Sequence, residues 1–82
     1  MALSKEQSVV LKSFGANVRR LRVQAGLTQA KLAELTDVEL RTEQKWERGE
    51  INAPLTTLAR VQSVLGCSWE SLLGKAVVKR AS

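Results

Sequence analysis

Histidine and tyrosine are absent from this 82-residue sequence, which also has a single cysteine, Cys67, and a single phenylalanine. Zinc sites, disulfides and the common catalytic triads need histidine or a second cysteine, so the sequence can supply none of them. Without tyrosine and with one phenylalanine, the sequence also has few of the rings on which bases stack in modules for RNA and single strands. We therefore predict a protein that is not an enzyme and that binds no metal and no cofactor.

Long apolar runs are missing as well, although hydrophobic residues make up 44% of the chain. A membrane span needs about 20 consecutive apolar residues, and the core of a signal peptide needs about 7–15. The apolar run near the N-terminus is limited to Val9–Leu11. The composition therefore predicts one small globular domain in the cytoplasm, with no membrane contact.

The balance of charge is positive, because 13 Lys and Arg residues stand against 8 Asp and Glu residues, for a net charge of +5. A basic surface on so small a domain is typical of proteins that bind polyanions. Since the aromatic residues that single-stranded partners require are scarce, double-stranded DNA is the expected partner.

Apolar residues recur at spacings of three and four along most of the chain, which predicts an all-α fold. Ser4 and Gln7 form a capping-box pattern at the start of the first helix, and Gly15 lies inside the periodic segment. Residues 1–13 are therefore predicted as an N-terminal arm or helical extension, residues 14–74 as the main helical domain and residues 75–82 as a basic tail. Beyond the first helix, which ends before Gly26, helices are expected at residues 29–35, 38–48, 55–65 and 69–73.

The segment Gln29–Gly49 carries the pattern QAKLAELTDVELRTEQKWERG, preceded by Thr28 and followed by a loop with Pro54. This pattern resembles the helix-turn-helix of the Cro/C1-type (Xre) repressor family, and the resemblance covers residues 14–73. It implies an all-α, five-helix, lambda-repressor-like DNA-binding domain. It also implies a transcriptional regulator that is cytoplasmic and encoded by a prokaryote or a phage.

One face of the third predicted helix is cationic and polar. At 100° per residue, Arg41, Lys45 and Arg48 fall within about 60° of one another, and Trp46 lies opposite. Such a face suits the major groove, where Arg and Lys donate to guanine and Gln pairs with adenine. The same charges would also suit a helix surface that is simply solvated.

The family resemblance implies a role for each residue around this helix. The residues implied to read bases are Leu40, Arg41, Gln44 and Lys45. Those implied to contact the DNA backbone are Thr28, Gln29, Arg48, Asn52 and Thr56. The resemblance further implies a structural salt bridge between Arg22 and Glu47.

Two positions depart from the family pattern. Asp37 replaces the usual glycine of the turn, which is acceptable because Asp tolerates a left-handed conformation. Glu43 replaces a buried Ile or Val, and it forms a stripe of like charge with Glu39 and Glu47. Because an unpaired buried carboxylate costs several kcal/mol, we hypothesise that Glu43 extends to solvent or pairs with a neighbouring cation.

A single helix reads only a few base pairs, so the predicted function is a repressor that binds a palindromic operator as a homodimer. Apolar residues available for the dimer are Trp69, Leu72, Leu73, Val77 and Val78, or alternatively Val9 and Val10. Residues 37–50 hold five acids and three bases, a net charge of −2. This acidity supports an alternative, a protein-interaction module on the same scaffold, such as an antitoxin or anti-repressor that binds a toxin or other protein partner.

Overall fold

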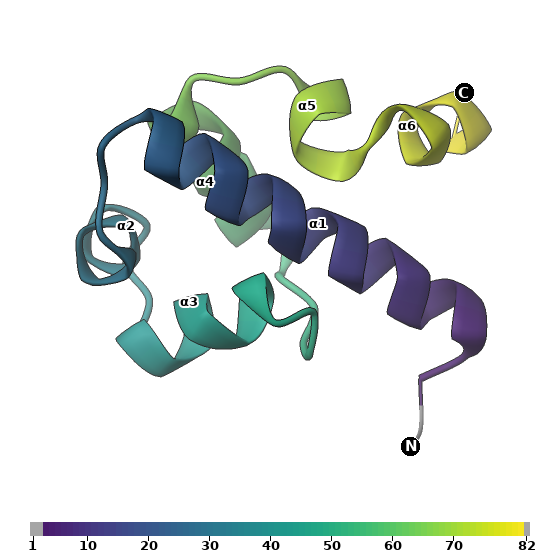
Figure 1. Cartoon of the computed structure of the whole chain (residues 1–82), viewed down its shortest axis with the longest axis horizontal. Helices are drawn as coiled ribbons and strands as arrows, with labels where there is room; N and C mark the ends of the chain where they lie inside the picture. Colours follow the sequence, from purple (N-terminus) through teal and green to yellow (C-terminus); the bar gives the residue numbers. More distant parts are fainter. Residues whose placement is uncertain (1–2, 82) are drawn as a thin grey trace.

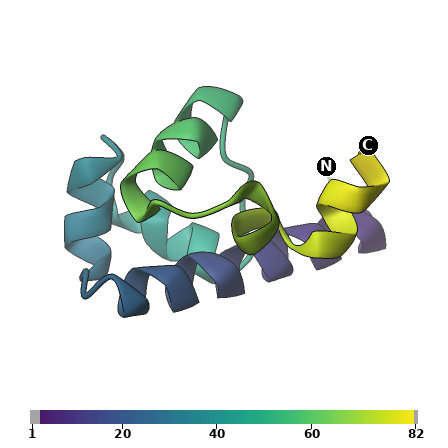
Figure 2. The ribbon, with the colours of Figure 1, turned by 90° about the horizontal axis from the view of Figure 1, so that it is seen from above.

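The computed structural model describes residues 3–81, which form six α-helices and no strand (Figure 1). The helices are α1 (Lys5–Gln24), α2 (Gln29–Leu35), α3 (Leu40–Glu47), α4 (Leu55–Leu65), α5 (Trp69–Leu73) and α6 (Lys75–Ala81). Helix α1 runs along the molecule, with α2 to α5 around its C-terminal part and α6 near its N-terminal part (Figure 1 and Figure 2). The predicted all-α class is confirmed. None of the helices within residues 3–81 combines the length and apolar character needed to cross a bilayer.

Local signals set the helix starts and the turn of the helix-turn-helix. The Ser4 hydroxyl accepts a hydrogen bond from the Gln7 backbone N–H, and the Ser4 backbone N–H donates one to the Gln7 side chain, which confirms the capping box. The hydroxyl oxygens of Thr28 and Ser68 cap α2 and α5 by accepting from the backbone N–H three residues further on. Asp37 lies between α2 and α3 at φ 58°, so the left-handed turn expected there is confirmed.

The core lies where α1, α2, α3, α4 and α5 meet. Trp46 of α3 is fully buried, and its ring stands edge-on to Phe14 of α1 with centroids 6.4 Å apart. Leu32 of α2 is also fully buried, and Val38 of the turn packs against the same cluster. These contacts form a core beneath the turn, and they fix α3 against α1 and α2.

Gly15 sits at the crossing of α1 and α3. A Cβ atom at this position would lie against the carbonyl oxygen of Trp46 and 2.8 Å from that of Glu47. The two helices therefore approach backbone to backbone, a distance that only glycine permits. Since α1 passes Gly15 without a break, residues 5–13 are a helical extension of α1.

Two helices, α6 and α3, differ from the prediction. Residues 75–81, expected as part of a basic tail, form α6, which raises the number of helices from five to six. Lys, Ala and Arg all have high helix propensity, so this short segment can continue as helix beyond Gly74. Helix α3 begins at Leu40 and not at Val38, because the Val38 amide still bonds to the carbonyl of Ala33 in the preceding turn.

Leu72 was wrongly predicted as a dimer-surface residue. It is fully buried in the core, because α5 packs against α1 and the Asn17 side chain donates a hydrogen bond of 3.0 Å to the Leu72 carbonyl. Of the other candidates from the same region, Trp69 is 39% exposed, whereas Leu73 and Val77 are half-buried. Five residues of α5 are too few for their spacing to show which side faces the core.

Candidate nucleic-acid interface

Helix α3 has one buried face and one exposed face. Glu43 and Trp46 on the inner face are both 0% exposed. The outer face carries a 42% exposed leucine, an exposed arginine and two half-buried polar residues, which are the predicted base-reading residues Leu40, Arg41, Gln44 and Lys45. The structure thus brings together on one surface the four side chains that sequence reasoning singled out.

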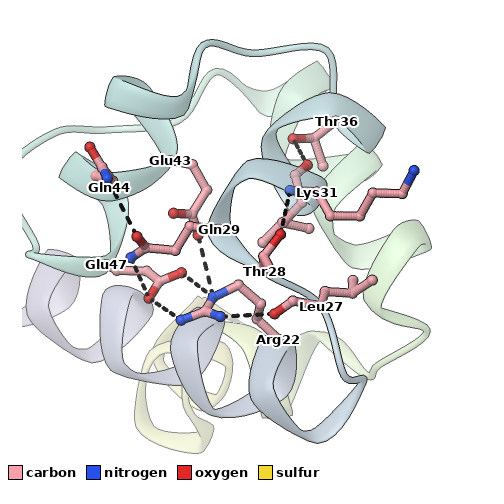
Figure 3. A network of polar contacts seen from close by, with 10 residues as sticks. Arg22, Leu27, Thr28, Gln29, Lys31, Thr36, Glu43, Gln44 and Glu47 are labelled. Carbon is pink, nitrogen blue, oxygen red and sulfur yellow. Dashed lines mark hydrogen bonds and ion pairs between the residues drawn. The ribbon is translucent and has the colours of Figure 1, made fainter.

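The N-terminus of α2 lies beside this surface. The Thr28 hydroxyl accepts a hydrogen bond from the Lys31 amide at 3.0 Å, so it acts as the cap of α2 while remaining exposed. Gln29 is half-buried and reaches α3: its amide nitrogen donates to Glu47 at 3.3 Å, and its amide oxygen accepts from Gln44 at 3.5 Å (Figure 3). A predicted backbone contact and a predicted base contact are therefore joined by a hydrogen bond.

The remaining predicted backbone contacts are all exposed. Arg48, directly after α3, forms an exposed ion pair with Glu50 at 3.0 Å. Asn52 lies in the following loop, and Thr56 lies in the first turn of α4. A phosphate contact by Arg48 therefore has to compete with the carboxylate of Glu50.

A buried ion pair anchors α3 to α1. The guanidinium of Arg22 donates to both carboxylate oxygens of Glu47, at 2.6 and 3.0 Å, and to the Leu27 carbonyl at 2.9 Å (Figure 3). The implied salt bridge is thus confirmed. Burial opposes ionisation of Glu47, but its hydrogen bonds with Arg22 and Gln29 help hold its pKa below the usual value. The bond to Glu47 correspondingly raises the pKa of Arg22.

Glu43 does not extend to solvent, so that part of our hypothesis is wrong. Its side chain is 0% exposed, and its nearest cation atom is Nε of Arg22 at 3.9 Å. Neither carboxyl oxygen has a hydrogen-bond donor. Burial, and then the neighbouring Glu47, raise the pKa of Glu43 to about 8. Glu43 lies on the inner face of α3 together with the fully buried Trp46, so its side chain points into the fold and not to water.

The inward orientation of two acids changes the charge of the surface. Glu43 and Glu47, with side-chain exposures of 0% and 5%, both lie with Arg22 inside the fold. The remaining charged residues of segment 37–50 are three acids and three bases, so its exposed charges balance. Of the three acids in the stripe, only Glu39, directly before α3, is therefore exposed.

A family model for helix-turn-helix domains matches residues 18–72, which span the core helices and the surface described above. The chain belongs to the helix-turn-helix family. No match was found among curated protein sequences. Family membership agrees with the resemblance to Cro/C1-type regulators and supports the prediction of a DNA-binding regulator.

Two solved structures resemble this helix-turn-helix protein. One is the clp gene regulator ClgR from Corynebacterium glutamicum, with 31% identity and a TM-score of 0.75 over 83% of this chain and 87% of that one. A second structure of ClgR has 28% identity and a TM-score of 0.73, over 88% of this chain and 81% of that one. The similarity thus extends over most of both chains.

Sequence reasoning missed one residue that closes the turn of this helix-turn-helix protein. Arg60 of α4 donates a hydrogen bond of 3.2 Å to the Thr36 carbonyl at the end of α2, and it lies 3.8 Å from the Asp37 carboxylate. No local pattern could have indicated this contact, because Arg60 and Thr36 are 24 residues apart. Within residues 3–81, no group of three acidic or cysteine side chains is placed to hold a metal ion.

Proposed function

We propose that this helix-turn-helix protein places α3 in the major groove of duplex DNA and represses transcription. The observation that carries the proposal is the exposed face of α3, where Leu40, Arg41, Gln44 and Lys45 lie opposite the buried Glu43 and Trp46. Arg41 suits donation to guanine O6 and N7, Gln44 suits pairing with adenine, and Leu40 suits contact with a thymine methyl. Repression follows from occupancy, because a bound domain excludes other proteins from the same DNA.

The proposed contacts to the DNA backbone position this face. They are made by Thr28, Gln29, Arg48, Asn52 and Thr56, on three segments that flank α3. Contacts with phosphates carry no sequence information directly, but they set the register in which α3 meets the bases. The balance of exposed charges in residues 37–50 supports this arrangement over a partner protein, because two of the five acids that favoured that alternative are buried with Arg22.

Sequence-specific binding is tested by mixing the protein with sheared genomic DNA at about 150 mM salt, where weak non-specific binding is largely suppressed, and sequencing the retained fragments. We expect a two-fold-symmetric motif to be enriched. Arg41→Ala should weaken binding to that motif by about 5- to 150-fold and relax its sequence preference, since one bidentate contact is worth about 1–3 kcal/mol. Lys75→Ala, which removes the same charge from α6, should cause only a small loss.

No enrichment by a folded protein would contradict DNA recognition and turn the search to a protein partner such as a toxin. Equal losses for Arg41→Ala and Lys75→Ala would show that only net charge matters, and not a base contact by α3.

We also propose that the protein acts as a homodimer on a palindromic operator. Val9, Val10 and Val77, predicted as two alternative dimer surfaces, line one groove between α1 and α6. A second copy that covers this groove would bury the 61% exposed side chain of Val9.

Val9→Glu should therefore give a folded monomer in sedimentation, with enrichment of half-sites only. Val23→Glu is the matched control, because Val23 is 59% exposed at the other end of α1 and should leave a dimer intact. A wild-type protein that sediments as a monomer at micromolar concentration, with and without its DNA, would contradict the homodimer.

A further inference from the structure

Two glutamates share one buried cluster beneath the outer face of α3. Glu43 and Glu47 lie one turn apart on the helix, and their Oε2 atoms lie 3.9 Å and 2.6 Å from the same Arg22 Nε. Neither oxygen of Glu43 has a donor, although both are shielded from water. Native proteins rarely leave a buried polar group unpaired, so this carboxyl group requires an explanation.

The cation in the cluster does not provide the missing donor. The single hydrogen of Arg22 Nε, the guanidinium atom that lies beside Glu43, is already donated to Glu47, while Nη1 and Nη2 donate to the Leu27 carbonyl and to Glu47. The 3.9 Å between Arg22 Nε and the nearer Glu43 oxygen is longer than a hydrogen bond. The guanidinium thus attracts Glu43 without satisfying its oxygens.

The charges of the cluster do not balance if both carboxyl groups are ionised. Within residues 3–81, the charged groups that act on Glu43 are Arg22 of α1 and Glu47 of α3. Helix α2 contributes only the uncharged amide of Gln29, because its Lys31 and Glu34 are exposed and lie 3.5 Å from each other. One guanidinium against two carboxylates leaves a buried net charge of −1, whereas one added proton makes the cluster neutral.

We propose that Glu43 is a neutral carboxylic acid in the folded protein and donates its proton to Glu47, and that it thereby positions Gln29 and Gln44 for DNA recognition. The proton supplies the donor that the cluster lacks and leaves a single carboxylate facing a single guanidinium. Glu43 is a positioning residue, since it lies inside the fold and acts through its neighbours (Figure 3). Only the part that concerns DNA depends on the proposed function.

A short chain of hydrogen bonds connects the proton to the outer face. Glu47 Oε1 accepts from the Gln29 amide at 3.3 Å, and the Gln29 oxygen accepts from the half-buried Gln44 amide at 3.5 Å. If Glu43 releases its proton to water, two carboxylates face one guanidinium, and their repulsion displaces Glu47 from both Arg22 and Gln29. The orientation of Gln44 on the DNA-facing surface then loses its support.

The direction of the pH effect follows from burial. The pKa of Glu43, about 8 in the folded protein, is well above the value of about 4.3 for a glutamate in an unfolded chain. The stabilisation due to the proton is therefore fully present at acidic pH, declines as the pH rises above about 4.3, and is lost once the pH passes about 8. The orientation of Gln44 changes only at the upper end of this window, where the folded protein itself releases the proton.

The test follows the glutamate carboxyl carbons and the glutamine side-chain amides of the isotopically labelled full chain by NMR, from about pH 4 to about pH 9.5. One carboxyl signal should titrate near pH 8, and the amide signals of Gln29 and Gln44 should shift with the same midpoint. In Glu43→Gln, whose amide replaces the protonated acid, all three changes should disappear. The control Glu39→Gln removes an exposed acid just before α3 and should keep them.

DNA binding supplies the second readout, with a duplex that carries the enriched motif. Wild-type affinity should fall above pH 8 by up to about tenfold per pH unit, whereas Glu43→Gln should show no such fall. The inference would be overturned if Glu43 titrated near pH 4, or if the signals of Gln29 and Gln44 did not shift as Glu43 titrates. Both outcomes are measured on the wild-type protein, so they can be tested even if the variant does not fold. If Glu43 titrates near pH 8 as expected but no DNA motif is enriched, only the proposed function is refuted.

Discussion

Arg22→Ala is expected to destabilise the folded protein by about 3–5 kcal/mol, the range measured when one partner of a buried ion pair is removed. The Arg22 side chain is 12% exposed, and its guanidinium neutralises a buried polar cluster shared by α1, α2 and α3. Without it, Glu47 loses two hydrogen bonds and Glu43 loses its nearest cation. The carbonyl of Leu27, in the segment just before α2, loses the hydrogen bond that it accepts from Arg22 as well.

Urea unfolding at neutral pH measures this loss. Arg19→Ala removes the same side chain from an exposed position of α1 and should change the free energy of unfolding by no more than about 0.5 kcal/mol. The pKa of Glu47 is lowered by folding, so the stability that Glu47 contributes is present above about pH 4.3 and fades as the pH falls further. The effect of Arg22→Ala should therefore shrink in acid. An equal loss for both variants would show that the buried pair adds nothing to stability.

Gly15→Ala is expected to destabilise the protein by about 3 kcal/mol or more, as overpacking does when the obstacle cannot move aside. In an exposed helix the same change stabilises by about 1 kcal/mol, so helix propensity alone predicts the opposite sign. The added methyl group would meet the backbone oxygens of Trp46 and Glu47, and no side-chain rotation relieves such a contact. Helices α1 and α3 would have to separate, which disturbs the core around Trp46.

Thermal unfolding of Gly15→Ala, with Ala16→Gly as its control, separates these two effects. Ala16 is the exposed neighbour in the same helix, so Ala16→Gly should cost only the propensity difference of about 1 kcal/mol. Since the Gly15 contact also sets the position of α3, Gly15→Ala should weaken DNA binding even where the protein remains folded. A stabilised Gly15→Ala variant would mean that α1 and α3 do not approach as closely as described.

The two variants concern the same structural problem, which is how an eight-residue helix is held rigidly enough to present side chains to a partner. Its core contacts come mainly from Trp46, and its polar anchor comes from Glu47. Propensity contributes little to so short a helix, so packing and the buried ion pair must hold it. Glu43, in the middle of the inner face of α3, adds a second acid beside this ion pair, and the arrangement of the cluster therefore depends on pH.

The sequence by itself determined the features that depend on neighbours within one or two helical turns. Capping side chains at Ser4, Thr28 and Ser68 lie three residues from the amides that they accept from, and Asp37 needs only its own tolerance of a left-handed turn. The same reasoning placed Trp46 opposite Arg41 on α3, because the helix period fixes angular position. The Arg22–Glu47 pair followed from family resemblance and not from any local pattern.

Tertiary structure alone decided the features that depend on contacts between distant segments. The Glu43 side chain is buried beside Arg22, which comes from another helix, so the spacing of residues along α3 could not show whether it would be buried or exposed. Leu72 faced the core and not a partner because α1 covers α5, and Gly15 mattered because α3 crosses it. Spacing along one helix sets directions, but only the packing of helices determines what lies in each direction.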